Sequence, residues 1–324
     1  MRAIGLWASW PLETGAEFWD YHGTMKAISF GAVLWDVIEG GEHIGGAPFN
    51  LAAHLAQMGC AAWMISRVGA DGRGAGALAE MRRLGVKPDF VQQDAAYPTG
   101  WVDVALSAGG QPTYTIHDNV AFDFIEAQPD FLKAVVKQPV DAFCFGTLEQ
   151  RAPTTRKTLF RLLDVVPAKH FFYDVNVRQH YYSERLVRDS LIHSTIVKLN
   201  DSEVDQLGQT LYGAALAEPE FVARLQKQYP RVRIVCVTKG ERGCTVYWDG
   251  QAGDCPGVRV QVVDTVGAGD AFSAAFLFKY CSGSSPFESA RLANQIGAFV
   301  ASQRGAVPAY TPEISALIAG AAPS

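Results

Sequence analysis

The stretch VVDTVGAGDAFSAAF, residues 262–276, places Gly267-Ala268-Gly269 directly before Asp270 and an apolar run. We interpret it as a strand that ends at Asp264-Thr265, a tight turn, and a helix that begins at Asp270. Folds of alternating strands and helices are built on this kind of connection. Free N–H groups at a helix start also bind anions, and glycines let a phosphate approach the backbone closely.

From Lys26 onward, short β-rich runs alternate with helical patterns. Strands are expected at 27–38, 61–68, 141–146, 170–175, 195–200, 232–238 and 244–248, and helices at 50–59, 76–85, 154–163, 218–228, 271–280 and 287–302. Apolar strands that alternate with helices predict a mostly parallel, doubly wound α/β sheet covered on both faces. Ligands of such sheets bind at the carboxyl ends of the strands.

Residues 99–118 break this rhythm, because they alternate with period two on both sides of Gly109-Gly110 and no helix precedes the next strand pattern. This pattern predicts a β-hairpin. Apolar residues on both of its strands need a surface to cover. We therefore expect a small β-lid over a site, formed by parts of 36–46 and 99–123, with a plain edge extension of the sheet as the alternative.

Composition and charge narrow the class of protein. The 324 residues are 48% hydrophobic and 19% charged, with 28 basic and 33 acidic residues and a net charge of −5. No basic block suggests a nucleic acid or an anionic membrane as partner, and no apolar run approaches the length of a membrane span. The six cysteines form no C-x-x-C pair, which indicates reduced thiols of a cytoplasmic protein. Residues 1–24 are expected to be a poorly ordered extension before a domain at 25–324, because Ser9 and Pro11 break any signal-peptide pattern.

Asp270 beside a glycine turn has two interpretations. It could simply cap the helix. A cap does not need glycine on both sides of Ala268, however, and a carboxylate beside an anion site repels the anion unless it is there to take a proton. The combination is typical of a kinase base beside a transferring phosphoryl group.

Two motifs carry a resemblance to a known family. The segment from Asp264 to Phe272, D-T-x-G-A-G-D-x-F, resembles the second signature of the PfkB (ribokinase-like) carbohydrate kinases, and Gly45-Gly46-Ala47-Pro48-Phe49-Asn50 resembles the first. The similarity runs from Met25 to about Pro312 and is strongest to bacterial fructokinases. It implies a ribokinase-like fold and an ATP-dependent sugar kinase.

The resemblance also assigns roles to matching positions. Asp270 is expected to be the base, the amides of Gly267, Ala268 and Gly269 an anion hole, and Arg178 a group that steadies phosphate charge. Sugar hydroxyls are expected at Asp36, Gly45, Gly46, Asn50 and Asn176. The nucleotide is expected at Thr238, Gly240, Gly243, Asn294 and Ala298. Mg²⁺ with its waters is expected at Asn200 and Glu203, a function that can coexist with a helix cap formed by the same two residues. A monovalent cation near Asp264 and a homodimer joined at the lid edge are further expectations.

The sequence departs from the fructokinase pattern at Ala32, where a glutamate usually follows the glycine. Such a glutamate would support the residues around Asp36, so the fine positioning of that carboxylate is in question. The catalytic assignment is not affected.

Other classes of protein fit the sequence less well. The GRGAGA segment at 72–77 matches a dinucleotide fingerprint but does not follow its strand directly. The chain has no Gly-Lys pair for a Walker A loop and no G-x-S-x-G elbow. A non-catalytic sugar sensor would not need both Asp270 and the glycine turn.

The lid segment HDNVA, residues 117–121, bears on the substrate. It aligns with an Arg-x-x-Ser-Ala motif of 2-keto-3-deoxygluconate kinases, with His117 in place of the arginine. Histidine does not bind a carboxylate bidentately with a permanent charge, which favours a neutral sugar. We expect D-fructose, converted to fructose 6-phosphate, with ribose or a nucleoside as the runner-up and 2-keto-3-deoxygluconate also open.

Overall fold

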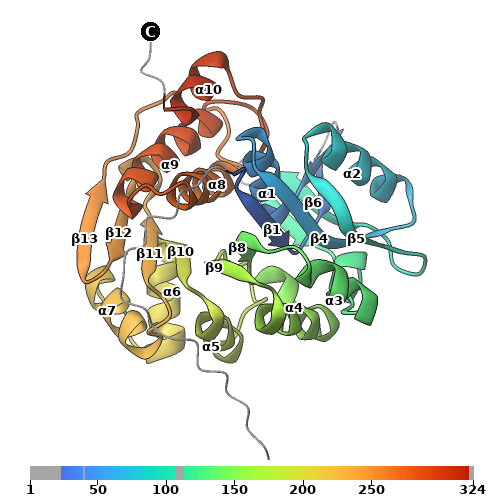
Figure 1. The fold of residues 1–324 in the computed structure, drawn as a ribbon, viewed down its shortest axis with the longest axis horizontal. Coiled ribbons are helices and arrows are strands. Elements are labelled where there is room, and N and C mark those ends of the chain that lie inside the picture. Colours follow the sequence, from blue (N-terminus) through green and yellow to red (C-terminus); the bar gives the residue numbers. More distant parts are fainter. Residues whose placement is uncertain (1–22, 39–40, 107–111, 321–324) are drawn as a thin grey trace, which may run out of the picture.

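The structure is a computed structural model and describes residues 23–38, 41–106 and 112–320. The predicted extension at 1–24 lies almost entirely outside this part of the chain. Figure 1 shows one large twisted sheet with helices on both faces and a smaller sheet to one side. The doubly wound α/β fold is confirmed.

The large sheet has nine strands in the order β13-β12-β11-β10-β9-β8-β1-β4-β5. All pairs are parallel except β11–β12 and β12–β13, which are antiparallel at one edge. The strand order reverses between β1 and β8, and ligands of open α/β sheets bind at such a point. The strands are β1 Lys26–Phe30, β4 Ala61–Gly69, β5 Lys87–Asp94, β8 Val140–Phe145, β9 Ala168–Asp174, β10 Ile196–Asn200, β11 Ile234–Thr238, β12 Cys244–Trp248 and β13 Gln251–Cys255.

Helices cover both faces, which explains why central strands such as β8 are buried at every position. One apolar core lies under α1, α2, α8 and α9, and the other under α3 to α7 (Figure 1). The helices are α1 Ala47–Gln57, α2 Gly72–Arg83, α3 Pro129–Val136, α4 Pro153–Val165, α5 Glu184–His193, α6 Asp201–Tyr212, α7 Glu218–Gln228, α8 Ala268–Cys281, α9 Pro286–Ala301 and α10 Pro312–Ile318, with 3₁₀ helices η1 Ala121–Phe124, η2 Leu148–Arg151 and η3 Gly240–Arg242. In the described residues, no helix combines the length and the apolar character needed to cross a membrane.

The smaller sheet has the order β3-β2-β6-β7, with β2 Leu34–Ile38, β3 Gly41–Gly45, β6 Gly100–Leu106 and β7 Pro112–Ile116. The antiparallel pairing of β6 with β7 confirms the predicted hairpin. A small apolar cluster, Ala32, Leu34, Val102, Val120 and Phe122, joins this sheet to the body of the molecule. Its function as a lid stays a prediction.

Two expected strands are wrong. Residues 27–38 form two strands in different sheets, because the chain turns at Gly31 with φ of 144°. No strand ends at Asp264-Thr265: in the described chain β13 already ends at Cys255, and the side chains of Val262 and Val263 are 60% and 52% exposed with no sheet to join. The helix after this segment begins at Ala268 rather than at Asp270.

Candidate active site

The N-terminus of α8 presents open backbone N–H groups at the carboxyl edge of the large sheet. Gly267 precedes the helix with φ of 79°, and no described side chain caps it. A Cβ on Gly267 would lie 2.4 Å from the carbonyl oxygen of Ala306, so only glycine fits this close approach. The first N–H groups of a helix have no intrahelical acceptor, although the amide of Ala268 lies 3.3 Å from the carbonyl of Thr265.

Asp270 lies in the first turn of α8 and is half-buried. Its Oδ2 accepts a hydrogen bond of 2.8 Å from Nδ2 of Asn50, which comes from α1. Burial raises the pKa of Asp270 to about 6, and the negative charge of Asp174 contributes to this rise. The hydrogen bond from Asn50 and the positive charges of Lys198 and Arg178 act in the opposite direction and lower this pKa. A carboxylate with this pKa is ionised at neutral pH and can take up a proton more readily than an ordinary aspartate.

Asn50 has spare hydrogen-bonding capacity. Its side chain is 4% exposed, and its Oδ1 is buried with no partner among the described residues. Buried polar atoms without a partner are rare in native proteins because they cost free energy. This atom lies beside Asp270, where a hydroxyl of a bound ligand would satisfy it.

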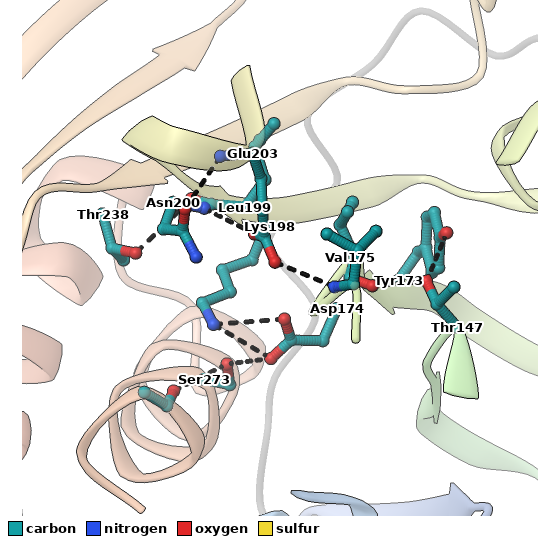
Figure 2. A network of polar contacts seen from close by, with 12 residues as sticks. Thr147, Tyr173, Asp174, Val175, Lys198, Leu199, Asn200, Glu203, Thr238 and Ser273 are labelled. Carbon is teal, nitrogen blue, oxygen red and sulfur yellow. Dashed lines mark hydrogen bonds and ion pairs between the residues drawn. The ribbon is translucent and has the colours of Figure 1, made fainter. Parts of the chain in front are cut away.

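A buried ion pair supports the start of α8 (Figure 2). Lys198 on β10 donates to both carboxylate oxygens of Asp174 on β9, at 3.1 and 3.2 Å. Ser273 on α8 donates to Asp174 at 3.2 Å, and its hydroxyl also lies 3.0 Å from the carbonyl of Gly269. A Cβ on Gly269 would lie 3.3 Å from the Lys198 ammonium, so the cation sits directly beneath the glycine turn.

Lys198 keeps its charge in this position. Burial alone would lower the pKa of Lys198, but the carboxylates of Asp174, Glu203 and Asp270 outweigh it and raise that pKa above its usual value. The sequence analysis missed Asp174, Lys198 and Ser273. A charged residue within a run of buried strand positions, as in TIVKLN at 195–200, is the signal that could have found Lys198.

Four of the predicted sugar-side residues are linked to one another, and Asn50 among them contacts Asp270. A Cβ on Gly45 would lie 2.7 Å from Oδ2 of Asp36 across the β2–β3 pair, and burial raises the pKa of Asp36. Gly46, with φ of 107°, precedes α1 and its carbonyl accepts the backbone N–H of Asn50 at 2.9 Å. A series of neighbouring groups therefore runs from Asp36 through Gly45, Gly46 and Asn50 to Asp270.

Asn176 and Arg178 follow β9 at the same edge of the sheet. Asn176 has a φ of 35°, a left-handed conformation that asparagine tolerates better than most residues. The charge of Arg178 lowers the pKa of Asp270, which places the two groups within electrostatic reach of each other.

Asn200 and Glu203 form a capping box at the start of α6. Oδ1 of Asn200 accepts the backbone N–H of Glu203 at 2.9 Å, and Glu203 accepts the N–H of Asn200 at 2.8 Å in return (Figure 2). The other carboxylate oxygen of Glu203 accepts the N–H of Val177 at 2.9 Å. The capping interpretation is confirmed. Within the described chain, no group of three or more His, Cys, Asp or Glu side chains could hold a metal ion.

The predicted nucleotide residues lie around the ends of β11, β12 and β13. Thr238 ends β11, and Gly240 and Gly243 flank the turn of η3 with φ of 57° and 87°. A Cβ on Gly243 would lie 2.1 Å from the carbonyl of Cys255. Asn294 on α9 donates to that same carbonyl at 2.9 Å. Ala298 lies one turn further along α9, on the same face as Asn294.

The chain is similar to known proteins along most of its length. The family described as "pfkB family carbohydrate kinase" matches residues 21–313. Fructokinase-1 of Oryza sativa subsp. japonica is 29% identical over 287 residues, which cover 84% of this chain and 87% of that protein.

Among solved structures, a fructokinase with bound ATP from Xylella fastidiosa superposes with a TM-score of 0.80 at 21% identity, covering 91% of this chain and 98% of that one. Aminoimidazole riboside kinase from Salmonella enterica gives a TM-score of 0.76 at 21% identity, with 90% and 99% covered. At these identities the structural likeness establishes the fold.

Proposed function

Because the chain belongs to the pfkB family of carbohydrate kinases and is a sugar kinase, we propose that it transfers the γ-phosphoryl group of ATP to the primary hydroxyl of D-fructose, giving fructose 6-phosphate. The observation that carries the proposal is the position of Asp270, held by Asn50 at the open N-terminus of α8. A base and an anion site side by side are what a direct, in-line phosphoryl transfer requires.

Asp270 removes the proton from the sugar hydroxyl as that oxygen attacks phosphorus. The γ-phosphoryl group goes to the sugar oxygen, and ADP leaves. The amides of Gly267 and Gly269 stabilise the negative charge on the transferred group, and the amide of Ala268 adds to them once it turns from the Thr265 carbonyl. Lys198 beneath the turn adds positive charge, and the charge of Arg178 acts on Asp270 in the same direction as that of Lys198.

The sugar binds between Asp36, Asn50 and the Gly45-Gly46 backbone. Oδ1 of Asn50, which lacks a partner among the described residues, accepts a sugar hydroxyl. The nucleotide lies at the ends of β11 to β13, along Thr238, Gly240, Gly243, Asn294 and Ala298. Closure of the smaller sheet excludes water, since water would otherwise be phosphorylated in place of the sugar.

Mg²⁺ accompanies ATP in this proposal and neutralises phosphate charge when bound. Glu203 and Asn200 fit a hydrated ion rather than a bare one, because both carboxylate oxygens of Glu203 already accept backbone N–H groups. Their remaining lone pairs would hold waters of the ion. A monovalent cation near Asp264 stays a prediction, and there both carboxylate oxygens accept N–H groups, from Val266 and Gly305.

A neutral sugar is favoured by the surroundings of His117. Its ring stacks on Trp101 at 4.2 Å, and Nε2 lies 2.6 Å from Oδ2 of Asp103. The neighbouring Arg151 is already engaged, with Asp123 through Nε at 2.8 Å and Nη2 at 3.0 Å, and with the carbonyl of His117. Neither group is disposed to bind the carboxylate of an acidic sugar.

The test is an ADP-release assay with ATP and Mg²⁺ across fructose, ribose, adenosine, 2-keto-3-deoxygluconate and glucose. We expect kcat/KM for fructose to exceed that for each other sugar by at least about tenfold, the scale of discrimination by a few pocket contacts. A preference for another sugar would retain the mechanism and replace the substrate. Turnover of none of them by the wild-type protein, with Asp270→Asn as the blank, would contradict the proposal and favour a sugar sensor.

A homodimer joined through the edges of the smaller sheet is also proposed. Its outer strands are β3 and β7. Although carbonyls on β7 accept hydrogen bonds from the side chains of Gln179 and Tyr181, neither strand pairs with a further strand among the described residues. Light scattering coupled to size-exclusion chromatography would give the mass of the particle, and a monomer at micromolar concentration would contradict this part of the proposal.

A further inference from the structure

Glu149 lies where the strand order of the large sheet reverses. It belongs to η2, which follows β8, and its side chain is 2% exposed. Its Oε1 lies 3.4 Å from the amide nitrogen of Ala32, the second residue after the neighbouring strand β1. The proposed mechanism gives this buried carboxylate no function.

The ends of both strands leave room for the Glu149 carboxylate. A Cβ on Gly31 would lie 1.9 Å from Oε1, a distance at which no side chain could exist. A Cβ on Gly146, at the end of β8, would lie 3.2 Å from Oε2. A buried carboxylate is costly unless hydrogen bonds hold it, so this arrangement is a specific feature of the chain rather than loose packing.

The Ala32 peptide links Glu149 to the sugar side of the site. Its N–H faces Oε1 of Glu149, and its carbonyl oxygen lies 2.5 Å from where a Cβ on Gly46 would be. The carbonyl of Gly46 accepts the N–H of Asn50, and the side chain of Asn50 donates to Asp270. The three hydrogen bonds are direct contacts, and the Ala32 carbonyl occupies the space that a side chain on Gly46 would need, so the backbone of Ala32 limits where Gly46 and, through it, Asn50 can lie.

We propose that Glu149 is a positioning residue of the sugar site, which fixes the Ala32 peptide against Gly46 and so holds Asn50 in place beside Asp270. The inference rests on the proposed function, because it concerns the sugar side of that same site. Where the fructokinase pattern has a glutamate, this chain has Ala32, and the carboxylate that contacts the Ala32 amide is that of Glu149 in η2.

The test compares Glu149→Leu with Glu149→Gln, which keeps an oxygen acceptor for the Ala32 amide. Asp141→Leu is the matched control: Asp141 is a buried carboxylate that accepts the N–H of Lys26 at 2.9 Å, at the opposite end of the same two strands.

We expect Glu149→Leu to raise KM for the sugar about tenfold, the cost of an unpaired buried amide, with KM for ATP unchanged within about twofold. Glu149→Gln is expected to stay within about threefold of the wild type, because one hydrogen bond is retained. Asp141→Leu is expected to lower Tm and leave both KM values unchanged.

Hydrogen exchange gives a readout that does not need the sugar. The amides of Ala32 and Asn50 are expected to exchange about tenfold faster in Glu149→Leu, but not in Glu149→Gln or Asp141→Leu. The inference is overturned if those amides stay protected in Glu149→Leu, or if Asp141→Leu raises the sugar KM as much. If the wild-type protein phosphorylates no sugar, the proposed function fails and the exchange measurement alone decides the inference.

Discussion

Two asparagine–acid pairs lie at the same edge of the large sheet and differ in what they leave open. In the pair Asn200–Glu203, Oδ1 of Asn200 and both carboxylate oxygens of Glu203 accept backbone N–H groups. In the pair Asn50–Asp270, one hydrogen bond joins the side chains, and the buried Oδ1 of Asn50 has no partner among the described residues. In the first pair each of these oxygens has a backbone donor, whereas in the second a buried oxygen lacks a partner among the described residues and has capacity for a ligand.

This difference separates a structural function from a chemical one. Burial raises the pKa of both acids, and the charge of Lys198 opposes this in both. Backbone N–H groups also stabilise the Glu203 carboxylate, whereas the hydrogen bond to Asp270 comes from the Asn50 side chain. A group whose hydrogen bonds are complete holds a helix in place, and a group with an open position can bind and exchange a proton. Removal of Asp270 should therefore affect catalysis, and removal of Glu203 should affect stability.

The largest effect is expected for Asp270→Asn. The amide cannot take the proton, so kcat should fall by about 10²–10⁴, the usual contribution of a positioned base. Burial raises the pKa of Asp270 above its value in the unfolded chain, so its ionisation at neutral pH lowers folding stability. The neutral variant should therefore have a Tm equal to or above that of the wild type. Steady-state kinetics and a thermal melt of the same sample check both parts. Normal turnover would rule out Asp270 as the base.

Asn50→Leu changes the other member of the Asn50–Asp270 pair. It removes the donor to Oδ2 of Asp270 and the acceptor for a sugar hydroxyl, so kcat/KM should fall about 10- to 100-fold, as for hydrogen bonds to charged groups. The lost donor should also raise the pKa of Asp270, since this bond lowers it in the wild type. The pH profile of the variant would show the second effect as an acid limb shifted upward. An unshifted limb would mean that Asn50 does not act on Asp270.

The pH dependence of the wild-type enzyme tests the raised pKa of Asp270. The base must be ionised, and its pKa is raised to about 6, so activity is present above that pH and lost as the pH falls through it. We expect kcat/KM to fall about tenfold per pH unit below this value, as for a single essential ionisation. An aspartate with an ordinary pKa would keep activity to about pH 4. A flat profile down to that pH would contradict the raised pKa.

The smallest effect on catalysis is expected for Glu203→Ala. Loss of the capping box and of the acceptor for Val177 should lower the free energy of unfolding by about 1–3 kcal/mol, measured by urea denaturation. The fall in kcat should be smaller than that of Asp270→Asn, because Glu203 reaches the phosphates only through water in our proposal. Glu288→Ala is the matched control, since Glu288 completes a capping box at the start of α9. A larger kinetic effect than that of Asp270→Asn would show that the two pairs had been assigned to the wrong functions.

Local sequence patterns were sufficient for many elements. The helix expected at 218–228 has those bounds in α7, and the hairpin and the capping box at Asn200 are present. The strand β5 was missed because its sequence, KPDFVQQD, is mostly polar and lies at a sheet edge. The run 27–38 was interpreted as one strand because its apolar pattern continues through Gly31. Only the tertiary structure shows that the chain turns at this glycine, with the Glu149 carboxylate packed against it.

The sequence by itself determined the alternation of strands and helices, the glycine turn before Asp270 and the cap at Asn200, because periodicity and turn chemistry act over a few residues. The tertiary structure decided which groups meet: Asn50 with Asp270 across 220 residues, and Ser273 with Asp174 across 99. These contacts depend on which strands are neighbours and where the strand order reverses. That order is set by the packing of all the helices on the sheet, and no short stretch of sequence contains it.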